Sequence, residues 1–198
     1  MKTKKLLNLG WIATVLFIGG TFILGSFLPD YSYVSQTVSE IGQQGSPLQL
    51  TWQIFSLLIG VLLILFSFGL ISFGRRNRWS IVPGLFILFA GISEFGIALY
   101  PSPHPLHNVF GLSMTIGYFS PLMFALFWKN KVGHSFKNYS LLAFVLILAG
   151  IFLNLTPLFA PDLYPLEYYG LIQRFLLFVF YLYCAYVGIS TLKVLKQG

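Results

Sequence analysis

The chain has 198 residues, of which 57% are hydrophobic and only 9% are charged, and its formal net charge is +7. About a quarter of the residues of a soluble domain are charged, so this composition excludes a disordered protein, a secreted disulfide scaffold and an ordinary cytosolic enzyme. The apolar residues also form long uncharged blocks, which indicate a polytopic membrane protein.

Six apolar blocks are long enough to cross a bilayer, because a helix needs about 20 residues to span the hydrocarbon core. In chain order they are Leu6–Leu28, Leu50–Phe73, Ile81–Tyr100, Asn108–Trp128, Ser140–Leu158 and Tyr168–Leu192. The first block is too long for a typical signal-peptide core and has no A-x-A cleavage site, so we interpret it as a helix of the protein. The predicted fold is all-α: one domain, a bundle of six transmembrane helices.

The positions of the basic residues predict the orientation of this bundle. All 12 Lys and Arg residues except Arg174 lie before the first block, after the last block, or in the gaps that follow the second and fourth blocks. The positive-inside rule therefore places both termini in the cytoplasm and the protein in the cytoplasmic membrane. The basic residues form no continuous stripe, so we do not expect a nucleic acid partner.

The longest predicted outer loop runs from Pro29 to Gln49. Within it, Thr37-Val38-Ser39-Glu40 has the pattern of a capping box, which predicts the start of a short interfacial helix. Gly42 and Gly45 are suited to end that helix. Two interpretations stay open: the loop covers a cavity as a lid, or it packs between helix ends.

Similar tripeptides introduce three predicted helices that run inward: Pro47-Leu48-Gln49, Pro105-Leu106-His107 and Pro165-Leu166-Glu167. Their nearly equal spacing suggests three tandem hairpins that share one orientation. The alternative is that proline commonly occupies the first position of a helix, without any duplication.

Polar residues inside the predicted spans concentrate toward the outer side. Glu94 in the third span and Arg174 in the sixth lie at similar depths, close enough for a salt bridge. The other polar residues at this side are Asp30, Ser35, Ser39, Glu40, Gln53, His104, His107, Asn108, Asn154 and Gln173. Because polar groups within a bilayer are costly and tend to be paired or functional, we expect a polar cavity that opens outward.

Two interpretations of Glu94 and Arg174 follow from this arrangement. In the first, the two charges neutralise each other and hold two helices in register. In the second, Arg174 and Gln173 hold an anionic or polar group of a ligand, because a guanidinium group suits phosphate or carboxylate.

His104 and His107 form an H-x-x-H pattern that could bind zinc together with Glu40, Glu94 or Asp162. The alternative is that His107 caps the fourth helix. No other cofactor is expected. Ser39 lacks an obvious triad, and the only cysteine, Cys184, is predicted to be a small buried apolar residue.

Three motifs in order resemble a known family: Val34-Ser35-Gln36-Thr37-Val38-Ser39-Glu40-Ile41-Gly42, His107-Asn108, and Gly170-Leu171-Ile172-Gln173-Arg174. Together they resemble the prokaryotic membrane family catalogued as domain of unknown function 998. The S-E-I-G segment is more distantly similar to that of the Frag1/DRAM/Sfk1 membrane proteins. The resemblance implies a six-helix layout and no established activity. It directs attention to Ser39, Glu40, His107, Asn108 and Arg174.

Two hypotheses for function follow. In the first, the protein lies in the lipid bilayer and binds a lipid headgroup or small amphiphile in the outer cavity. The candidate ligand-binding residues are Ser39, Glu40, Glu94, His107, Asn108, Gln173 and Arg174. In the alternative, the protein is an intramembrane hydrolase or transferase, with or without a metal, and Glu40, Glu94 and His107 are the candidate catalytic residues.

Overall fold

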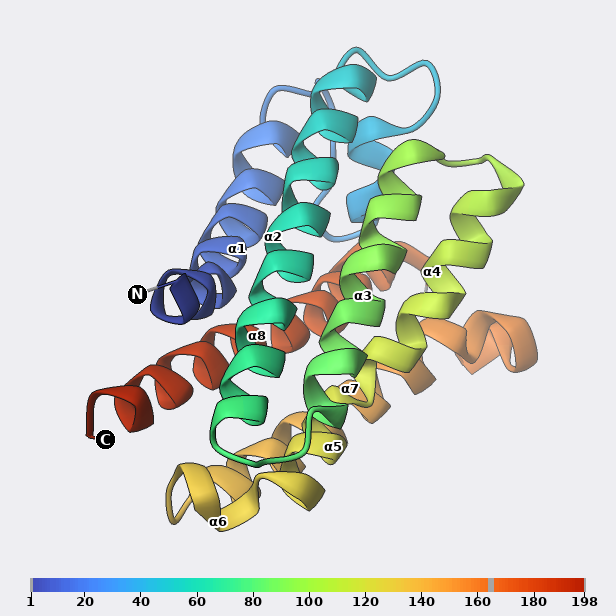
Figure 1. Ribbon diagram of the computed structural model, residues 1–198. Coiled ribbons are helices and arrows are strands. Elements are labelled where there is room, and N and C mark those ends of the chain that lie inside the picture. The colour runs from blue at the N-terminus through green and yellow to red at the C-terminus, as the bar shows by residue number, and fades with distance from the viewer. Residues whose placement is uncertain (1, 164–165, 198) are drawn as a thin grey trace.

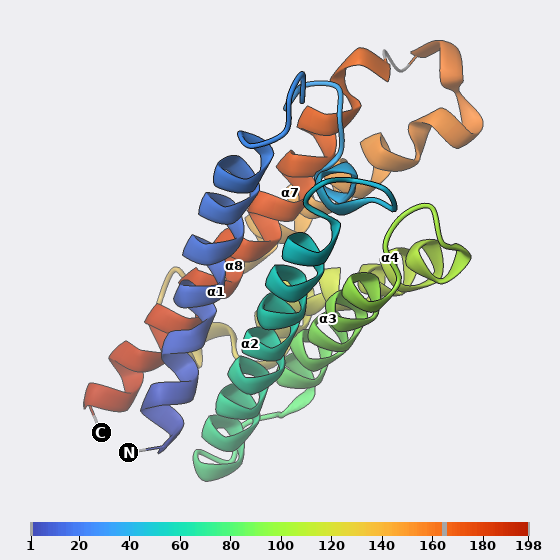
Figure 2. The same cartoon turned by 90° about the horizontal axis from the view of Figure 1, so that it is seen from above.

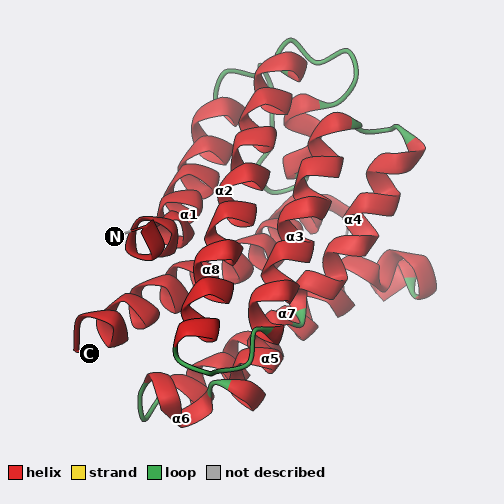
Figure 3. Ribbon diagram, viewed as in Figure 1, coloured by secondary structure: helices red, strands yellow, loops and turns green. Residues whose placement is uncertain are grey.

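The computed structural model describes residues 2–163 and 166–197, and within these ranges every regular element is helical (Figure 3). The helices are α1 (Lys2–Gly25), α2 (Gln49–Arg76), α3 (Val82–Leu99), α4 (Pro105–Tyr118), α5 (Ser120–Phe127), α6 (Lys129–Val132), α7 (Phe136–Phe159) and α8 (Tyr169–Gln197). Short 3-10 turns are η1 (Val38–Gly42), η2 (Pro161–Leu163) and η3 (Leu166–Tyr168).

The predicted all-α fold with six potential spans is confirmed. Six helical segments are long and apolar enough to cross a membrane, and the fourth of them consists of α4 and α5 in succession. This fourth segment begins at Pro105, not at Asn108, and is interrupted at Phe119. Pro121 explains the interruption, because it lies in the first turn of α5 and has no N–H to continue the hydrogen bonds of α4.

The proline tripeptides lie at different positions relative to their helices. Pro105 is the first residue of α4, whereas Pro47 precedes α2 by two residues. Pro165 lies outside the described residues. The threefold repeat therefore stays a prediction.

The long helices form a closed ring around a shared core (Figure 1). Around this ring, α1 contacts α2, α2 contacts α3, and α3 contacts both α4 and α5. Helix α7 then packs on α5 and α8, and α8 returns to α1. Contacts between α4 and α7 are few, so these two helices are separated from each other, whereas α5 and α7 are packed together.

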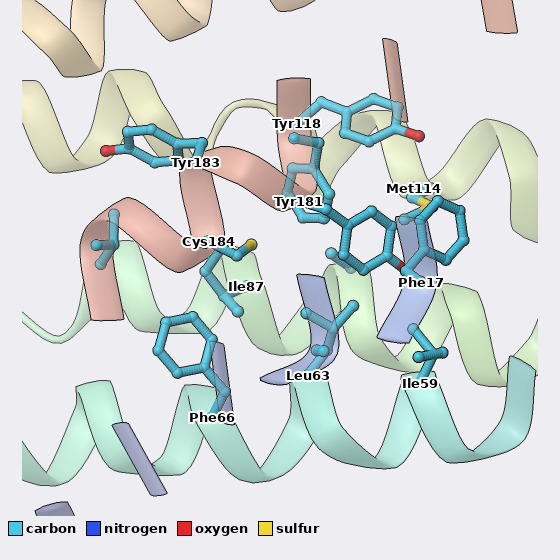
Figure 4. Close-up of a cluster of buried hydrophobic side chains, with 14 of the residues drawn as sticks. Phe17, Ile59, Leu63, Phe66, Ile87, Met114, Tyr118, Tyr181, Tyr183 and Cys184 are labelled. Carbon is cyan, nitrogen blue, oxygen red and sulfur yellow. The ribbon is translucent and has the colours of Figure 1, made fainter. Parts of the chain in front are cut away.

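Aromatic and aliphatic side chains fill the centre of the ring (Figure 4). Phe17 of α1 stacks on Tyr181 of α8 with ring centroids 3.9 Å apart. Phe66 of α2 and Cys184 of α8 are fully buried, which confirms the prediction that Cys184 is a buried apolar residue. Figure 2 shows that α1 begins and α8 ends at the same end of the bundle. We call this the terminal end, and we call the opposite end, with residues 26–48, 100–104, 160–163 and 166–168, the loop end.

Candidate functional site

Arg174 fastens the loop of residues 26–48 to α8. Its side chain is 3% exposed, and its Nη1 donates hydrogen bonds to the carbonyl oxygens of Tyr33 (2.8 Å), Gln36 (2.6 Å) and Gly170 (3.0 Å). Its Nη2 donates to the hydroxyl of Tyr31. The guanidinium carbon also lies 5.5 Å from the ring centroid of Tyr31 and 5.3 Å from that of Tyr33. These contacts occupy most of the guanidinium group.

The expected pairing of Glu94 with Arg174 is wrong. Within the described residues no ion pair joins them, because Arg174 donates to loop carbonyls while Glu94 lines a cavity that Arg174 does not reach. Depth along two helices gives the height of each side chain, but it does not give the direction in which the side chain points around its helix axis. The geometry gives Arg174 the role of an anchor for the loop in place of the expected ligand contact.

Further contacts hold the same loop in place. The amide of Val38 donates to Oε1 of Gln173 (2.7 Å), and the amide of Leu171 donates to the carbonyl oxygen of Val34 (2.8 Å). Gly170 lies so close to the loop that a Cβ atom would be 2.1 Å from the carbonyl oxygen of Gln36. The glycine is therefore required for this approach of loop to helix.

Tyr31 lies between the loop backbone and Arg174. Its hydroxyl donates to the carbonyl oxygen of Thr37 (2.6 Å). Burial raises the pKa of Tyr31 to about 12, even though the neighbouring Arg174 charge acts to lower the pKa. The neutral phenol is thus the form that the folded loop accommodates.

The capping box predicted at residues 37–40 is confirmed. The side chain of Thr37 accepts a hydrogen bond from the amide of Glu40, and the carboxylate of Glu40 accepts one from the amide of Thr37. The resulting turn, η1, ends at Gly42, as expected. Glu40 is committed to this turn and does not line the cavity.

A cavity of about 510 Å³ toward the loop end is lined by residues of α1, η1, α2, α3, α4, α7, η3 and α8. Its polar lining consists of Ser39, Ser56, Glu94, His107, Asn108, Thr115, Tyr118, Asn154, Tyr169 and Gln173. The larger apolar side chains of the lining are Phe17, Trp52, Ile97, Leu112, Met114, Ile151, Leu155, Leu158, Leu166, Leu176 and Leu177. Of the seven candidate ligand-binding residues, the cavity brings together all but Glu40 and Arg174.

The two histidines have separate roles. Nδ1 of His104 accepts a hydrogen bond from the amide of Leu106 (3.2 Å), so His104 caps α4, and the alternative that His107 is the cap is wrong. Nδ1 of His107 lies 2.8 Å from the carbonyl oxygen of Tyr100, and its Nε2 lies 3.2 Å from Oγ of Ser39. Across residues 2–163 and 166–197, no three His, Cys, Asp or Glu side chains are placed to share a metal ion, so the geometry gives no support to zinc binding by His104 and His107.

Glu94 is the acidic side chain of the cavity. It is 5% exposed, and within the described residues it has no hydrogen bond or ion pair. Tyr118 lines the same cavity as Glu94, and the hydroxyl of Tyr181 is buried without a hydrogen-bond partner among the described residues. None of the described side chains that line the cavity belongs to Lys or Arg.

A comparison with known families covers nearly the whole chain. The family described as "Protein of unknown function (DUF998)" matches residues 11–190. The chain belongs to this family. No curated protein and no solved structure matches it. The predicted membership is thereby confirmed for DUF998, whereas the prokaryotic origin and the likeness to Frag1/DRAM/Sfk1 proteins stay predictions.

In this DUF998 chain, sequence reasoning missed the contact between Ser39 and His107. The two residues are separated by 68 positions and lie on a loop turn and a helix, so no periodicity connects them. Both residues do fall within the motifs that resemble the family. That coincidence is the signal from which their proximity could have been inferred.

Proposed function

We propose that this DUF998 protein binds an amphiphile, a molecule with a polar group and an apolar tail, in the cavity near the loop end. The observation that carries the proposal is the mixed lining of that cavity. Apolar side chains of α7 and α8 offer contacts to a tail, while Ser39, His107 and Asn108 offer hydrogen-bonding groups.

The divergence of α4 and α7 supports a lateral entry route from the membrane. These helices make few contacts with each other, although each of them lines the cavity. Leu112 on α4 and Leu158 on α7 are 63% and 82% exposed, so the rim of this gap is apolar. Such a rim suits a lipid tail that stays partly in the bilayer.

The distribution of charge supports a location at the outer leaflet of the cytoplasmic membrane. The basic gaps and chain ends gather at the terminal end, which the positive-inside rule assigns to the cytoplasm. The loop end and the cavity beside it would then face outward. A ligand from the outer leaflet is therefore the amphiphile that the cavity would take.

Filling the cavity tests this proposal. Gly111 lines the cavity, and a Cβ built there has no neighbour within 4 Å, so Gly111→Phe places a ring in open space. Gly19→Phe is the matched control, because Gly19 is equally open but does not line the cavity. We expect native mass spectrometry of protein extracted from membranes to find lipid retained by wild type and Gly19→Phe, and lost from Gly111→Phe. Equal retention by all three would overturn the proposal.

A second candidate function, acyl transfer from an ester, is favoured by the hydrogen bonds of His107. The carbonyl oxygen of Tyr100 can only accept, so Nδ1 of His107 carries the proton and Nε2 is free to accept one from Ser39. A serine with this partner can attack an ester carbonyl while His107 takes the proton and returns it to the departing alcohol. The acyl group on Ser39 would then pass to water or to another alcohol.

Reactivity toward a fluorophosphonate tests this second candidate, because such probes label only activated serines. We expect labelling of wild type and of Ser35→Ala, an exposed serine of the same loop, and no labelling of Ser39→Ala or His107→Gln. Absence of labelling in wild type would rule out Ser39 as a nucleophile. It would leave amphiphile binding unaffected.

A further inference from the structure

We infer that the cavity takes an amphiphile with a positively charged ammonium group, and that Glu94 receives that group. This inference rests on the proposed amphiphile binding and adds the chemical class of the ligand. It reverses the expectation from the sequence, in which Arg174 would have selected an anionic ligand.

The first argument is the charge of the lining. Glu94 is a carboxylic acid at the cavity wall, and across residues 2–163 and 166–197 no Lys or Arg side chain shares that wall. Arg174 contributes its charge to the loop carbonyls of Tyr33 and Gln36 instead. Among the described side chains of the cavity wall, Glu94 is therefore the group that can meet a ligand with a negative charge, and no Lys or Arg offsets that charge.

The second argument is the lack of a partner for Glu94. Its side chain is 5% exposed, and within the described part of the chain it has neither a hydrogen bond nor an ion pair. Within the described residues no cationic side chain is placed to neutralise Glu94, and a carboxylate at this depth is costly unless a cation or a proton neutralises it. An ammonium group of the ligand supplies that neutralisation.

The third argument is the aromatic surface beside Glu94. Phe17, Trp52 and Tyr118 line the same cavity, and Figure 4 shows Phe17 and Tyr118 gathered with Tyr181 in one cluster. Aromatic faces together with a carboxylate are the combination that attracts quaternary ammonium groups in proteins.

The test compares two probes that differ only in charge. Octyltrimethylammonium and its uncharged analogue, with carbon in place of nitrogen, are titrated from micellar solution into protein held in dodecyl maltoside, a detergent without an ammonium group, and the heat from protein-free micelles is subtracted. We expect wild type to bind the ammonium probe about tenfold or more tightly than the uncharged analogue. Glu94→Gln should bind both probes equally, whereas Glu94→Asp should keep the preference.

Asp162→Asn is the matched control, because it removes one negative charge from an exposed residue that does not line the cavity. It should keep the wild-type preference. If wild type binds both probes equally, or if Glu94→Gln keeps the preference, the inference falls while amphiphile binding stands. If wild type binds neither probe while its co-purifying lipid also survives Gly111→Phe, both fall. Elution of each variant as a monodisperse peak establishes that the comparison is made on folded protein.

Discussion

Two buried ionisable side chains near the loop end differ in their hydrogen-bond partners. Arg174 donates to three backbone carbonyls, whereas Glu94 has no partner within the described residues. A buried charge with hydrogen bonds of this kind stabilises the structure around it, while a buried charge without them indicates a site for something that the chain does not itself supply. Arg174 explains how the loop is held, and Glu94 is the basis for the ammonium ligand that we propose.

Substitution of Arg174 should destabilise the protein without acting on the cavity directly. Arg174→Met removes the guanidinium donor from the loop carbonyl oxygens of Tyr33 and Gln36, at a cost of about 1–3 kcal/mol each. Arg174→Lys restores only part of these contacts, because an ammonium group lacks the planar fork of a guanidinium group. We expect melting temperatures of the solubilised protein in the order wild type, Arg174→Lys, Arg174→Met. Lys193→Met, an exposed basic position on α8, is the control and should melt as wild type does. Wild-type melting of Arg174→Met would contradict the anchoring role.

Tyr31 predicts a loss of stability in alkali. Its pKa is 10.0 in the unfolded chain and about 12 in the folded chain, so the unfolded chain loses its proton first. The contribution of Tyr31 is therefore complete below about pH 10 and decreases as the pH rises to about 12. Tyr31→Phe should be less stable than wild type at neutral pH, because it loses the hydrogen bonds to Thr37 and Arg174. Its melting temperature should nevertheless fall less steeply with pH, and an equal slope would contradict the assignment.

At the scale of elements, the loop of residues 26–48 and the start of α8 act as one unit. Hydrogen bonds from Arg174, Leu171 and Val38 cross between them, and Gly170 allows their backbones to meet. The capping box keeps η1 in shape, so Ser39 is presented to His107 on α4. Because it is held against α8, the loop forms a fixed part of the cavity wall.

Gly170→Ala should separate the loop of residues 26–48 from the start of α8. The added Cβ would lie 2.1 Å from the carbonyl oxygen of Gln36, a backbone atom that cannot turn aside as a side chain would. We expect a loss of about 2 kcal/mol or more and faster protease cleavage within residues 26–48. Gly19→Ala adds the same methyl group to a helix where nothing lies within 4 Å, so it should be neutral or slightly stabilising. Protection of the loop in Gly170→Ala equal to wild type would count against the docked arrangement.

The elements that local rules govern could be predicted from the sequence, and the contacts between them could not. The six spans could be predicted from the lengths of the apolar segments, because the thickness of a bilayer determines how long a spanning helix must be. The capping box could be predicted from a pattern of four residues. The break at Phe119 was missed because the run of residues continues through Pro121 without a charged residue. The partners of Arg174 were missed because they are backbone carbonyls, which cannot be recognised from a pattern of side chains.

At the scale of the whole molecule, the ring of helices separates charge from the cavity. The gaps and chain ends that carry Lys and Arg gather at the terminal end, while the cavity and its acidic residue lie toward the opposite end. This arrangement ties the proposed function to orientation. A cavity toward the loop end serves the outer leaflet only if the terminal end faces the cytoplasm.

Orientation can be measured with single cysteines in a Cys184→Ala background, since Cys184 is the only native cysteine and is buried. Gln43→Cys reports on the loop end and Asn77→Cys on the terminal end, and both native side chains are exposed. We expect a membrane-impermeant maleimide to label Gln43→Cys in intact cells and Asn77→Cys only after lysis, because Arg75, Arg76 and Arg78 favour retention of their gap in the cytoplasm. A chain labelled at Asn77→Cys in intact cells would have the opposite orientation, and its cavity would then draw ligands from the inner leaflet. Replacing those three arginines with glutamine should increase labelling of Asn77→Cys in intact cells if this charge is what sets the orientation.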